Sequence, residues 1–480
     1  MAFEHYNSGR SHVFDRAFFG GNFSATNNIV TSLTGSNYPT IYNVAYLDAN
    51  SMFVYGGAYG NIPGNIGPYV AKVNPATLKP VWYTQLLTNS TDGNEWDYPG
   101  VLAAMKDGKL YVISGYRLWK LDPKNGSIID TLVLPTCHPG TATNEYNAPS
   151  NTSFNGFNAT SDGTIVAKSL YRAAGLTNQG PSALGATNAN TTNIPPSILV
   201  SIDPKSMRVL DTITLPETVG ARPTITTYNG YDFVYMIGST TNGEMNTFRY
   251  LVYKGKFFLD PNWNGDNVSL KGQTYPTSFG VMNDWVVFAV NSLKSTVPMN
   301  VIAISQADSS VQCTIQPFVS DPLLYNFTNS QGATNVSWVT AAVSVDSANN
   351  MVYCFDAIPG QLAALQLITN NPTNPQLQIF WKAEQTTTEF TTLIGPTNAR
   401  VLVSSDIPIN QVPGANSNDY VIWRNAATGT ELACSPILPA ITFGTMIPPY
   451  YNGDLMYPGY TNGNLIRLHP LPRATPTPRR

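Results

Sequence analysis

The residues best suited to chemistry in this chain are a few charged side chains set among polar and aromatic residues. The segment "GNEWDYPG" (93–100) places Glu95 and Asp97 on either side of a tryptophan. Paired carboxylates act as general acid and base when a cleft shifts their pKa values. Arg172 follows the strand-like run "TIVAKSLY", and Arg222 lies in "GARPT". A planar guanidinium is suited to hold a carboxylate or another oxyanion.

These residues predict a site with a catalytic pair and a rim. Asp97 is the expected acceptor of a proton or a ligand hydroxyl, and Arg222 is the expected holder of an anionic group. The rim is expected to consist of Glu95, His138, Glu145, Arg172 and Glu389. An ion pair or a cap that stabilises a loop is the alternative role for every one of them. The sequence leaves both roles open.

Other chemistries find little support. Histidine occurs only at positions 5, 12, 138 and 469, so a site with several histidine ligands is not expected. The chain lacks a GxSxG elbow, a P-loop and an HExxH motif. No series of regularly spaced aspartates indicates calcium binding. We therefore expect no metal site, and the sequence assigns no cofactor.

A repeated hairpin is the element that must position these residues. "LWKLDPKNGSIIDTLVLP" (118–135) contains two alternating strands around an Asp-Pro-Lys-Asn-Gly turn. The same plan predicts hairpins near 70–86, 116–135, 197–216, 249–264, 300–318, 362–383 and 420–439.

A very apolar strand after a short turn precedes each hairpin. Eight such strands begin about 58 residues apart on average, at Met52, Leu110, Ile165, Phe233, Val286, Met351, Val401 and Leu455. Four strands in a period of this length indicate a propeller blade. We predict an all-β, single eight-bladed β-propeller of four-stranded antiparallel blades over residues 1–472, with seven blades as the alternative. Residues 473–480 form a Pro- and Arg-rich tail that we expect to be disordered.

The last blade lacks one strand. After "NLIRLHP" (464–470) only the tail remains, whereas "HVFDRAFF" (12–19) alternates near the N-terminus. We predict that these two segments pair and close the ring, since closure removes an open edge. The long loops would then collect on one face, around the mouth of the central channel, where binding residues concentrate.

The blade pattern with its "LDPKNG" turn resembles the eight-bladed propeller repeat of quinoproteins (the PQQ-repeat type). The resemblance implies the fold. It does not extend to redox chemistry, because the chain has no adjacent Cys-Cys pair, and the tryptophan-docking repeat of that family is also expected to be missing. None of the family's functional residues is carried over.

The amino-acid composition limits the kinds of partner that the protein is expected to bind. Charged residues make up 11% of the chain and the net charge is −3, so nucleic acid is not an expected partner. No apolar run reaches the ~18 residues of a membrane helix.

Low charge with abundant Asn, Thr and Tyr is typical of a secreted protein, so we expect an extracellular mature chain without its signal peptide. Nine N-x-S/T sequences are compatible with glycosylation. Cys137, Cys313, Cys354 and Cys434 are expected to be buried and unpaired, with one disulfide among them left open.

Two functions remain open. One is a secreted propeller that binds a small polar molecule at the channel mouth and transforms it by acid/base chemistry. The other is a non-catalytic extracellular recognition or assembly module that binds a protein or glycan through Tyr, Trp and Asn loops. The sequence decides neither between them nor whether the protein is an enzyme.

Overall fold

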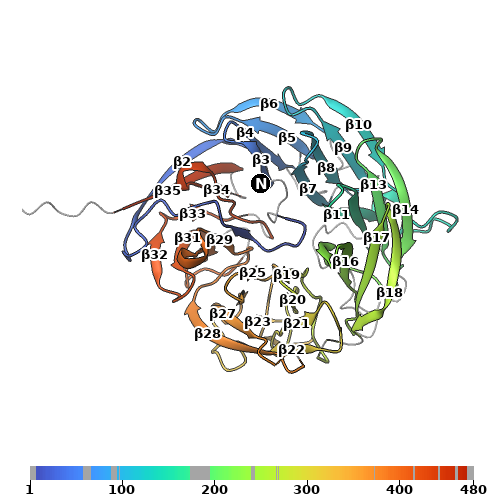
Figure 1. The fold of residues 1–480 in the computed structure, drawn as a ribbon. Helices are drawn as coiled ribbons and strands as arrows, with labels where there is room; N and C mark the ends of the chain where they lie inside the picture. Colours follow the sequence, from blue (N-terminus) through green and yellow to red (C-terminus); the bar gives the residue numbers. More distant parts are fainter. Residues whose placement is uncertain are drawn as a thin grey trace, which may run out of the picture.

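The computed structural model of the chain is a ring of eight β-sheets around a central axis (Figure 1). Its helical segments, within the part described, are the short 3-10 turns Pro149–Asn151, Thr397–Ala399 and Tyr451–Gly453. No helix in that part is long and apolar enough to cross a membrane. The predicted all-β, eight-bladed propeller is confirmed. The structure describes residues 7–57, 66–87, 95–96, 98–172, 195–238, 244–265, 268, 270–371, 373–413, 417–441, 444–459 and 463–472.

Blades 1 to 7 each contain four antiparallel strands in chain order, the first at the centre of the ring and the fourth at its rim. The strands of blades 1 to 4 are β3 (Ile41–Asp48), β4 (Ser51–Gly56), β5 (Tyr69–Val73), β6 (Pro80–Gln85); β7 (Pro99–Ala104), β8 (Leu110–Ser114), β9 (Arg117–Leu121), β10 (Ile128–Val133); β11 (Thr152–Ala159), β12 (Ile165–Tyr171), β13 (Ile198–Asp203), β14 (Arg208–Thr214); and β15 (Thr224–Tyr228), β16 (Tyr231–Ile237), β17 (Thr247–Tyr253), β18 (Lys256–Gly265).

The strands of blades 5 to 7 are β19 (Gly280–Met282), β20 (Trp285–Ala289), β21 (Val301–Ser305), β22 (Gln312–Ile315); β25 (Ser344–Asp346), β26 (Met351–Asp356), β27 (Gln361–Ile368), β28 (Gln376–Glu384); and β29 (Thr392–Ile394), β30 (Val401–Asp406), β31 (Asn418–Asn425), β32 (Glu431–Cys434). Blade 7 also receives β33 (Leu438–Pro439), which pairs with β31. A separate hairpin of β23 (Phe327–Thr328) and β24 (Thr334–Asn335) lies between blades 5 and 6 in the chain.

The strand repeat predicted from the sequence matches these strands closely. Seven of the eight anchor residues fall in the second strand of a blade, the eighth, Leu455, begins the innermost described strand of blade 8, and all seven predicted hairpins are third and fourth strands. The second strands are largely apolar because each blade packs between two neighbours and is covered on both faces. Every residue of β8 and of β20 is buried, whereas β10 at the rim is mostly exposed.

Blade 8 is closed by a different N-terminal segment from the one that the sequence predicted. β2 (Ile29–Asn37) pairs antiparallel with β35 (Asn464–Leu471), which pairs with β34 (Leu455–Pro458). The prediction that residues 12–19 form this outer strand was wrong. In blades 1 to 4 and in blade 6 the rim strand is followed directly in the chain by the inner strand of the next blade, and β2 is likewise followed directly by β3. Short connections of this kind are the rule.

The segment 8–14 instead lies at the centre of the ring, where N marks the chain end in Figure 1. Its carbonyl oxygens accept hydrogen bonds from the inner strands of four successive blades, through the amides of Ile225, Val281, Val345 and Leu393 at 2.8–3.1 Å. The segment ends in β1 (Val13–Phe14), which runs parallel to β29. The N-terminus therefore joins blades 4 to 7 from inside the ring.

Two tryptophans dock on the neighbouring blade. The indole N–H of Trp82 in β6 donates to the Pro123 carbonyl (3.2 Å), and that of Trp381 in β28 donates to the Ala426 carbonyl (2.9 Å). A Cβ added to Gly126 or Gly429, in the turns they cover, would lie 2.5 or 2.8 Å from the indole ring. The expectation that tryptophan docking is missing was therefore wrong for blades 1 and 6, because the turn residues around these glycines vary and hide the repeat.

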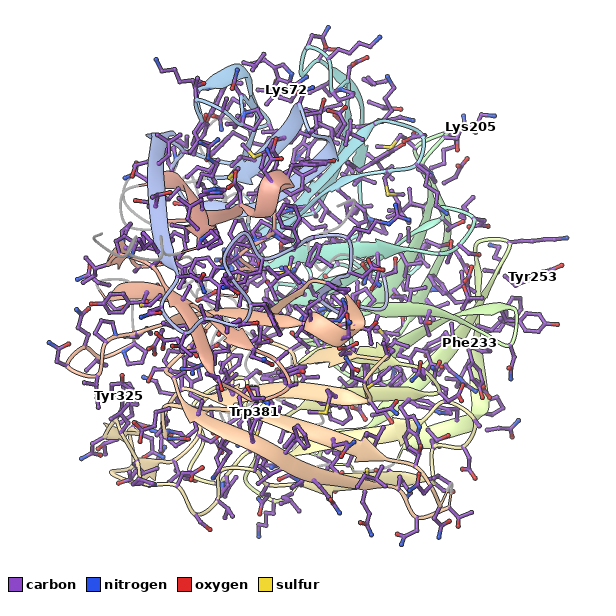
Figure 2. The ribbon with its side chains drawn as sticks, turned by 60° about the vertical axis from the view of Figure 1, so that its left-hand side comes forward. Lys72, Lys205, Phe233, Tyr253, Tyr325 and Trp381 are labelled. Carbon is purple, nitrogen blue, oxygen red and sulfur yellow. The ribbon has the colours of Figure 1, made fainter. Side chains whose placement is uncertain are left out.

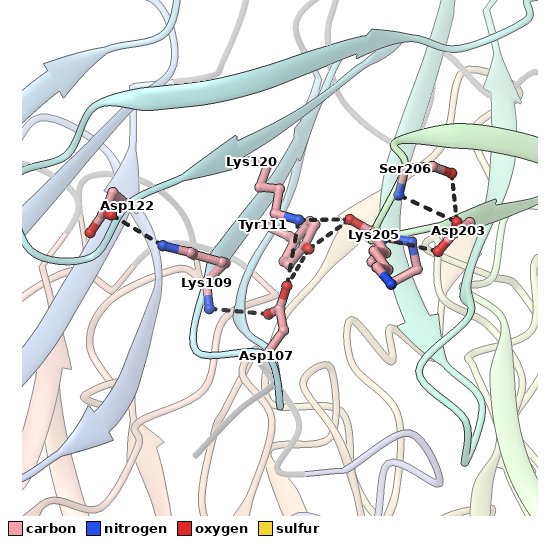
Figure 3. Close-up of polar contacts among 9 residues, drawn as sticks. Asp107, Lys109, Tyr111, Lys120, Asp122, Asp203, Lys205 and Ser206 are labelled. Atoms are coloured by element: carbon pink, nitrogen blue, oxygen red, sulfur yellow. Dashed lines mark hydrogen bonds and ion pairs between the residues drawn. The ribbon is translucent and has the colours of Figure 1, made fainter.

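The tight turns and the long loops lie on opposite faces of the ring. Figure 2 shows Lys205 and Tyr253, from turns between third and fourth strands, on the side away from Tyr325 of a long loop. On the turn face, Tyr111 donates to Asp107 (2.7 Å), and both Tyr111 and Lys120 donate to the Pro204 carbonyl at 2.9 Å (Figure 3). These contacts tie blade 2 to blade 3.

Candidate functional site

Arg222 reaches from one side of the ring to another. It precedes β15 of blade 4, and its guanidinium donates a hydrogen bond to the hydroxyl of Tyr42 in β3 of blade 1. The guanidinium carbon also lies 5.4 Å from the centroid of the Tyr42 ring. The Arg222 backbone amide is fixed by the Ser278 hydroxyl of the next loop (2.9 Å). The predicted position of Arg222 near the centre of the ring thus agrees with these contacts.

A distorted strand makes room for this side chain. In β11 of blade 3 the register shifts between Phe154 and Phe157, and Gly156 within the shift has a φ of +134°. A Cβ at Gly156 would lie 3.3 Å from Nε of Arg222. Only glycine adopts this backbone readily, and bulges of this kind often lie next to functional sites.

Lys168 in β12 adds a second cation to the same region. Its side chain is fully buried, and its ammonium donates to the carbonyl oxygens of Val219 (2.6 Å) and Gly220 (3.4 Å). Burial lowers the pKa of Lys168 well below its usual value, and the charge of Arg222 lowers it further. We call Arg222, Tyr42, Gly156 and Lys168 the Arg222 cluster.

Glu389 belongs to a separate group of carboxyls where blade 7 meets blade 8. Its oxygens accept hydrogen bonds from the Thr388 hydroxyl and the Thr445 amide, each at 2.8 Å. Burial raises the pKa of Glu389 well above its usual range. Asp419 in β31 accepts from the Ile441 amide (2.8 Å) and the Tyr457 hydroxyl (2.9 Å), and burial raises its pKa to about 7.

Glu389, which the sequence placed on the rim of the site, has its contacts where blade 7 meets blade 8. It is fully buried, and its carboxylate oxygens accept hydrogen bonds from Thr388 and Thr445. A side chain at the start of an inner strand can face either the axis or a neighbouring blade, and Glu389 bonds to Thr445 in the segment that leads to blade 8. The sequence pattern predicts where a residue lies along its blade, but not the direction in which its side chain points.

Glu95 and Arg172 stabilise loops. Glu95 pairs with Arg117 of β9 and accepts from the Tyr116 hydroxyl (3.1 Å). Arg172 is buried, donates to Asn151 (3.1 Å), and lies over the Trp96 ring at 5.1 Å. Both have the contacts of the alternative, loop-stabilising role.

The remaining predicted residues lie apart or outside the described part. His138 is partly buried, and its Nδ1 lies 2.9 Å from the Pro139 carbonyl. Glu145 is exposed. Asp97 lies outside the described residues. All four cysteines are free; Cys354 is buried, Cys137 and Cys313 are partly buried, and Cys434 is exposed.

Sequence reasoning missed Tyr42, Gly156 and Lys168. A lysine inside the apolar run "TIVAKSLY" is a signal of a buried cation, because lysine is seldom fully buried. Tyr42 carried no such signal, since its partner lies 180 residues away in the sequence.

Comparison with known proteins establishes the fold. No protein-family model and no curated protein matches the sequence. The quinohemoprotein alcohol dehydrogenase from Comamonas testosteroni is similar in structure, with a TM-score of 0.59 at 10% identity, over 97% of this chain and 80% of that one. The corresponding enzyme from Pseudomonas putida HK5 gives 0.57 at 10% identity, over 100% and 82%. The Dos1 propeller gives 0.53 at 8% identity, over 92% and 95%. The resemblance to quinoprotein propellers is thereby confirmed as one of fold.

The residues near the axis do not fit the redox groups that the names of the two dehydrogenases imply. The four cysteines are dispersed over the sequence at positions 137, 313, 354 and 434. Among the described residues no group of three or more His, Cys, Asp or Glu is arranged to hold a metal ion. The N-terminal segment lines the inner strands of blades 4 to 7. We therefore assign neither a quinone nor a haem to this chain.

Proposed function

We propose that this protein binds a small polar molecule carrying a carboxylate or another oxyanion at the long-loop end of the central axis, with Arg222 as its anchor. The observation that carries this proposal is the position of the Arg222 guanidinium, held across the ring by Tyr42 and accommodated by the bulge at Gly156. The side chain is partly exposed, so a ligand from solvent has access to it.

Pre-organisation favours binding at this arginine. The ring and hydroxyl of Tyr42 fix the guanidinium plane, so little rotamer entropy remains to be lost when a ligand binds. Lys168 supports the same preference, because burial lowers the pKa of this lysine and an anion beside Arg222 offsets the repulsion that lowers it further. Asp97 stays a proposed acceptor for a ligand hydroxyl, and Glu95, His138, Glu145 and Arg172 stay proposed rim residues.

The proposal concerns binding first, and Glu389 is not a candidate for acid/base catalysis. A general acid must reach the proton that it transfers, whereas Glu389 is fully buried and bonded through both oxygens. We also propose that Asp97 acts as an acid or a base on the ligand that Arg222 holds.

A panel of anions tests the proposal. Citrate, malonate, phosphate and selenate at matched ionic strength are added to the wild type and to Arg222→Met, and the melting temperature is measured. At least one anion should raise the melting temperature of the wild type, in a saturable way, and leave Arg222→Met unchanged. Arg208→Met removes an exposed arginine from β14 and serves as the control. Equal stabilisation of all three proteins would refute the role of Arg222.

A recognition module is the second candidate, and the rim of the ring favours it. Large apolar side chains are exposed on the outer strands: Val81 and Tyr83 on β6, Ile129 and Val133 on β10, Phe258 and Leu259 on β18, and Phe380 on β28. Exposed apolar residues on edge strands are typical of protein interaction surfaces. Serine at Ile129 and Val133 should then abolish binding of a partner protein and leave anion binding intact.

An extracellular location also remains a proposal. Of the sequons on described residues, Asn22, Asn125 and Asn326 are exposed, whereas Asn151, Asn158 and Asn335 are buried. Expression in a secretory eukaryotic host should attach glycans to exposed sequons only, which mass spectrometry before and after deglycosylation will show. Glycans at none of the three exposed asparagines would remove this support for secretion.

A further inference from the structure

An ammonium group lies between two aromatic rings on the long-loop face, away from the Arg222 cluster. Nζ of Lys294 lies 3.5 Å from the ring centroid of Phe327 and 4.9 Å from that of Trp338. The two rings have centroids 6.2 Å apart and planes at 81°, so they form two walls of a corner. Tyr325 packs behind Phe327 at 6.1 Å. A cation this close to ring faces is held by the ring quadrupoles.

The Lys294 ammonium has only aromatic partners. Among the described residues, no carboxylate lies within 4 Å of it, and no hydrogen bond from Nζ to a protein acceptor is present. Burial lowers the pKa of Lys294. An ammonium has three N–H donors and is strongly hydrated. The corner therefore suits a cation that has no N–H to satisfy better than it suits lysine.

The two walls are fixed by backbone contacts that do not involve the Lys294 side chain. The Trp338 amide donates to Asp356 (2.8 Å), and the Ala357 amide donates to the Trp338 carbonyl (3.0 Å). Phe327 lies in the β23–β24 hairpin, where Asn335 donates to its carbonyl oxygen (3.1 Å). The corner should keep its shape when Lys294 swings out, because lysine is a flexible chain on the surface side of this frame.

We propose that Phe327 and Trp338 form a binding site for a quaternary ammonium group, and that Lys294 occupies this site as an internal competitor. Quaternary ammonium ligands are recognised by aromatic walls, since their methyl groups carry the charge and need no hydrogen-bond acceptor. The chemical class is a trimethylated amine, either in a small molecule of the choline type or on a methylated lysine. This site is independent of the anion site at Arg222.

Titration calorimetry with choline and tetramethylammonium tests the proposal. Lys294→Ala should bind both about tenfold more tightly than the wild type, because a competing cation–π contact of this size is removed. Lys294→Arg keeps a competing cation and should bind no more tightly than the wild type. Lys294→Ala combined with Phe327→Ala should lose binding. The neutral choline isostere 3,3-dimethyl-1-butanol should bind at least tenfold more weakly than choline.

Two results would overturn the proposal. One is a folded Lys294→Ala protein, with the melting temperature of the wild type, that binds choline no more tightly than the wild type. The other is equal affinity for choline and its neutral isostere. If Lys294→Ala does not fold, Lys294→Met fills the space of the lysine stem and takes its place in the comparison. A peptide with trimethyl-lysine, compared with its unmethylated form, distinguishes a protein tail from a small molecule as the source of the group.

Discussion

Buried ionisable side chains carry much of the chemistry of this ring at the scale of single residues. Lys168 near blade 4 and the carboxyls Glu389 and Asp419 of blade 7 are enclosed by protein and bonded to backbone groups. Such groups favour their neutral forms. They therefore make stability depend on pH even without a catalytic role.

The carboxyls of blades 6 and 7 predict that the protein is more stable in mild acid. Burial raises the pKa of Asp419 to about 7 and those of Asp356 and Asp406 to about 6. Unfolded aspartate titrates near 4, so between about pH 4 and 7 the folded state binds more protons. The free energy of unfolding should therefore fall as pH rises through this window, by at most about 1.4 kcal/mol per pH unit for each group.

Asp419→Asn is the matched test of this sign. The asparagine keeps an acceptor for Ile441 and cannot ionise, so the fall in stability between pH 5 and pH 8 should become shallower. Denaturant unfolding at several pH values measures it. Asp130→Asn changes an exposed aspartate on β10 and should leave the slope unchanged. Equal slopes for Asp419→Asn and the wild type would contradict the account, since the opposite effect of buried Lys168 on the slope is common to both proteins.

At the scale of elements, contacts between a rim strand and the next turn hold neighbouring blades together. Trp82 covers Gly126, and Trp381 covers Gly429. In blade 3 the same kind of position is taken by Leu210, whose side chain would meet a Cβ at Gly255 at 2.4 Å. The contact thus recurs with different side chains, and this variation concealed it in the sequence.

Gly126→Ala and Gly108→Ala separate docking from backbone strain. Both glycines have similar positive φ angles, 75° and 72°, so alanine should cost about 1–2 kcal/mol at each through strain. Only at Gly126 would the new Cβ meet an indole, at 2.5 Å, which should cost a further ~1–3 kcal/mol. Denaturant unfolding measures both variants. Equal losses of unfolding free energy in the two variants would mean that the Trp82 side chain moves aside without cost.

At the scale of the whole molecule, the N-terminal segment contributes to the ring in two places. Segment 8–14 joins inner strands of blades 4 to 7, and β2 completes blade 8. Each use closes contacts between residues that are hundreds of positions apart in the sequence. Residues 8–37 therefore join blades 4 to 7 and supply the outer strand of blade 8.

Two truncations should separate these roles. Removal of residues 1–14 leaves β2 in place, so the protein should fold with a lower melting temperature and faster amide exchange at Ile225, Val281 and Val345. Removal of residues 1–37 exposes β35 as an edge and should give a protein that aggregates. Amide exchange with mass spectrometry and calorimetry measure both. Unchanged exchange after the shorter truncation would contradict the placement of segment 8–14.

The sequence predicted the repeating parts of this molecule and not its single contacts. Strand alternation and turn residues recur in each blade, so the eight anchors and seven hairpins follow from local pattern. The closing strand was misassigned because residues 12–19 and 29–37 both alternate, and only ring geometry selects the second. Arg222 was found as a rare cation at the start of an inner strand, whereas its partner Tyr42 depends on closure of the ring.

Anomalous diffraction from crystals soaked in selenate tests the proposed anion site most directly. Selenate is an oxyanion, and its selenium atom is located from its own anomalous signal. We expect a selenium peak within hydrogen-bond distance of the Arg222 guanidinium in the wild type, and its loss in crystals of Arg222→Met. Selenium peaks confined to exposed lysines of the turn face, with none beside Arg222, would contradict the account.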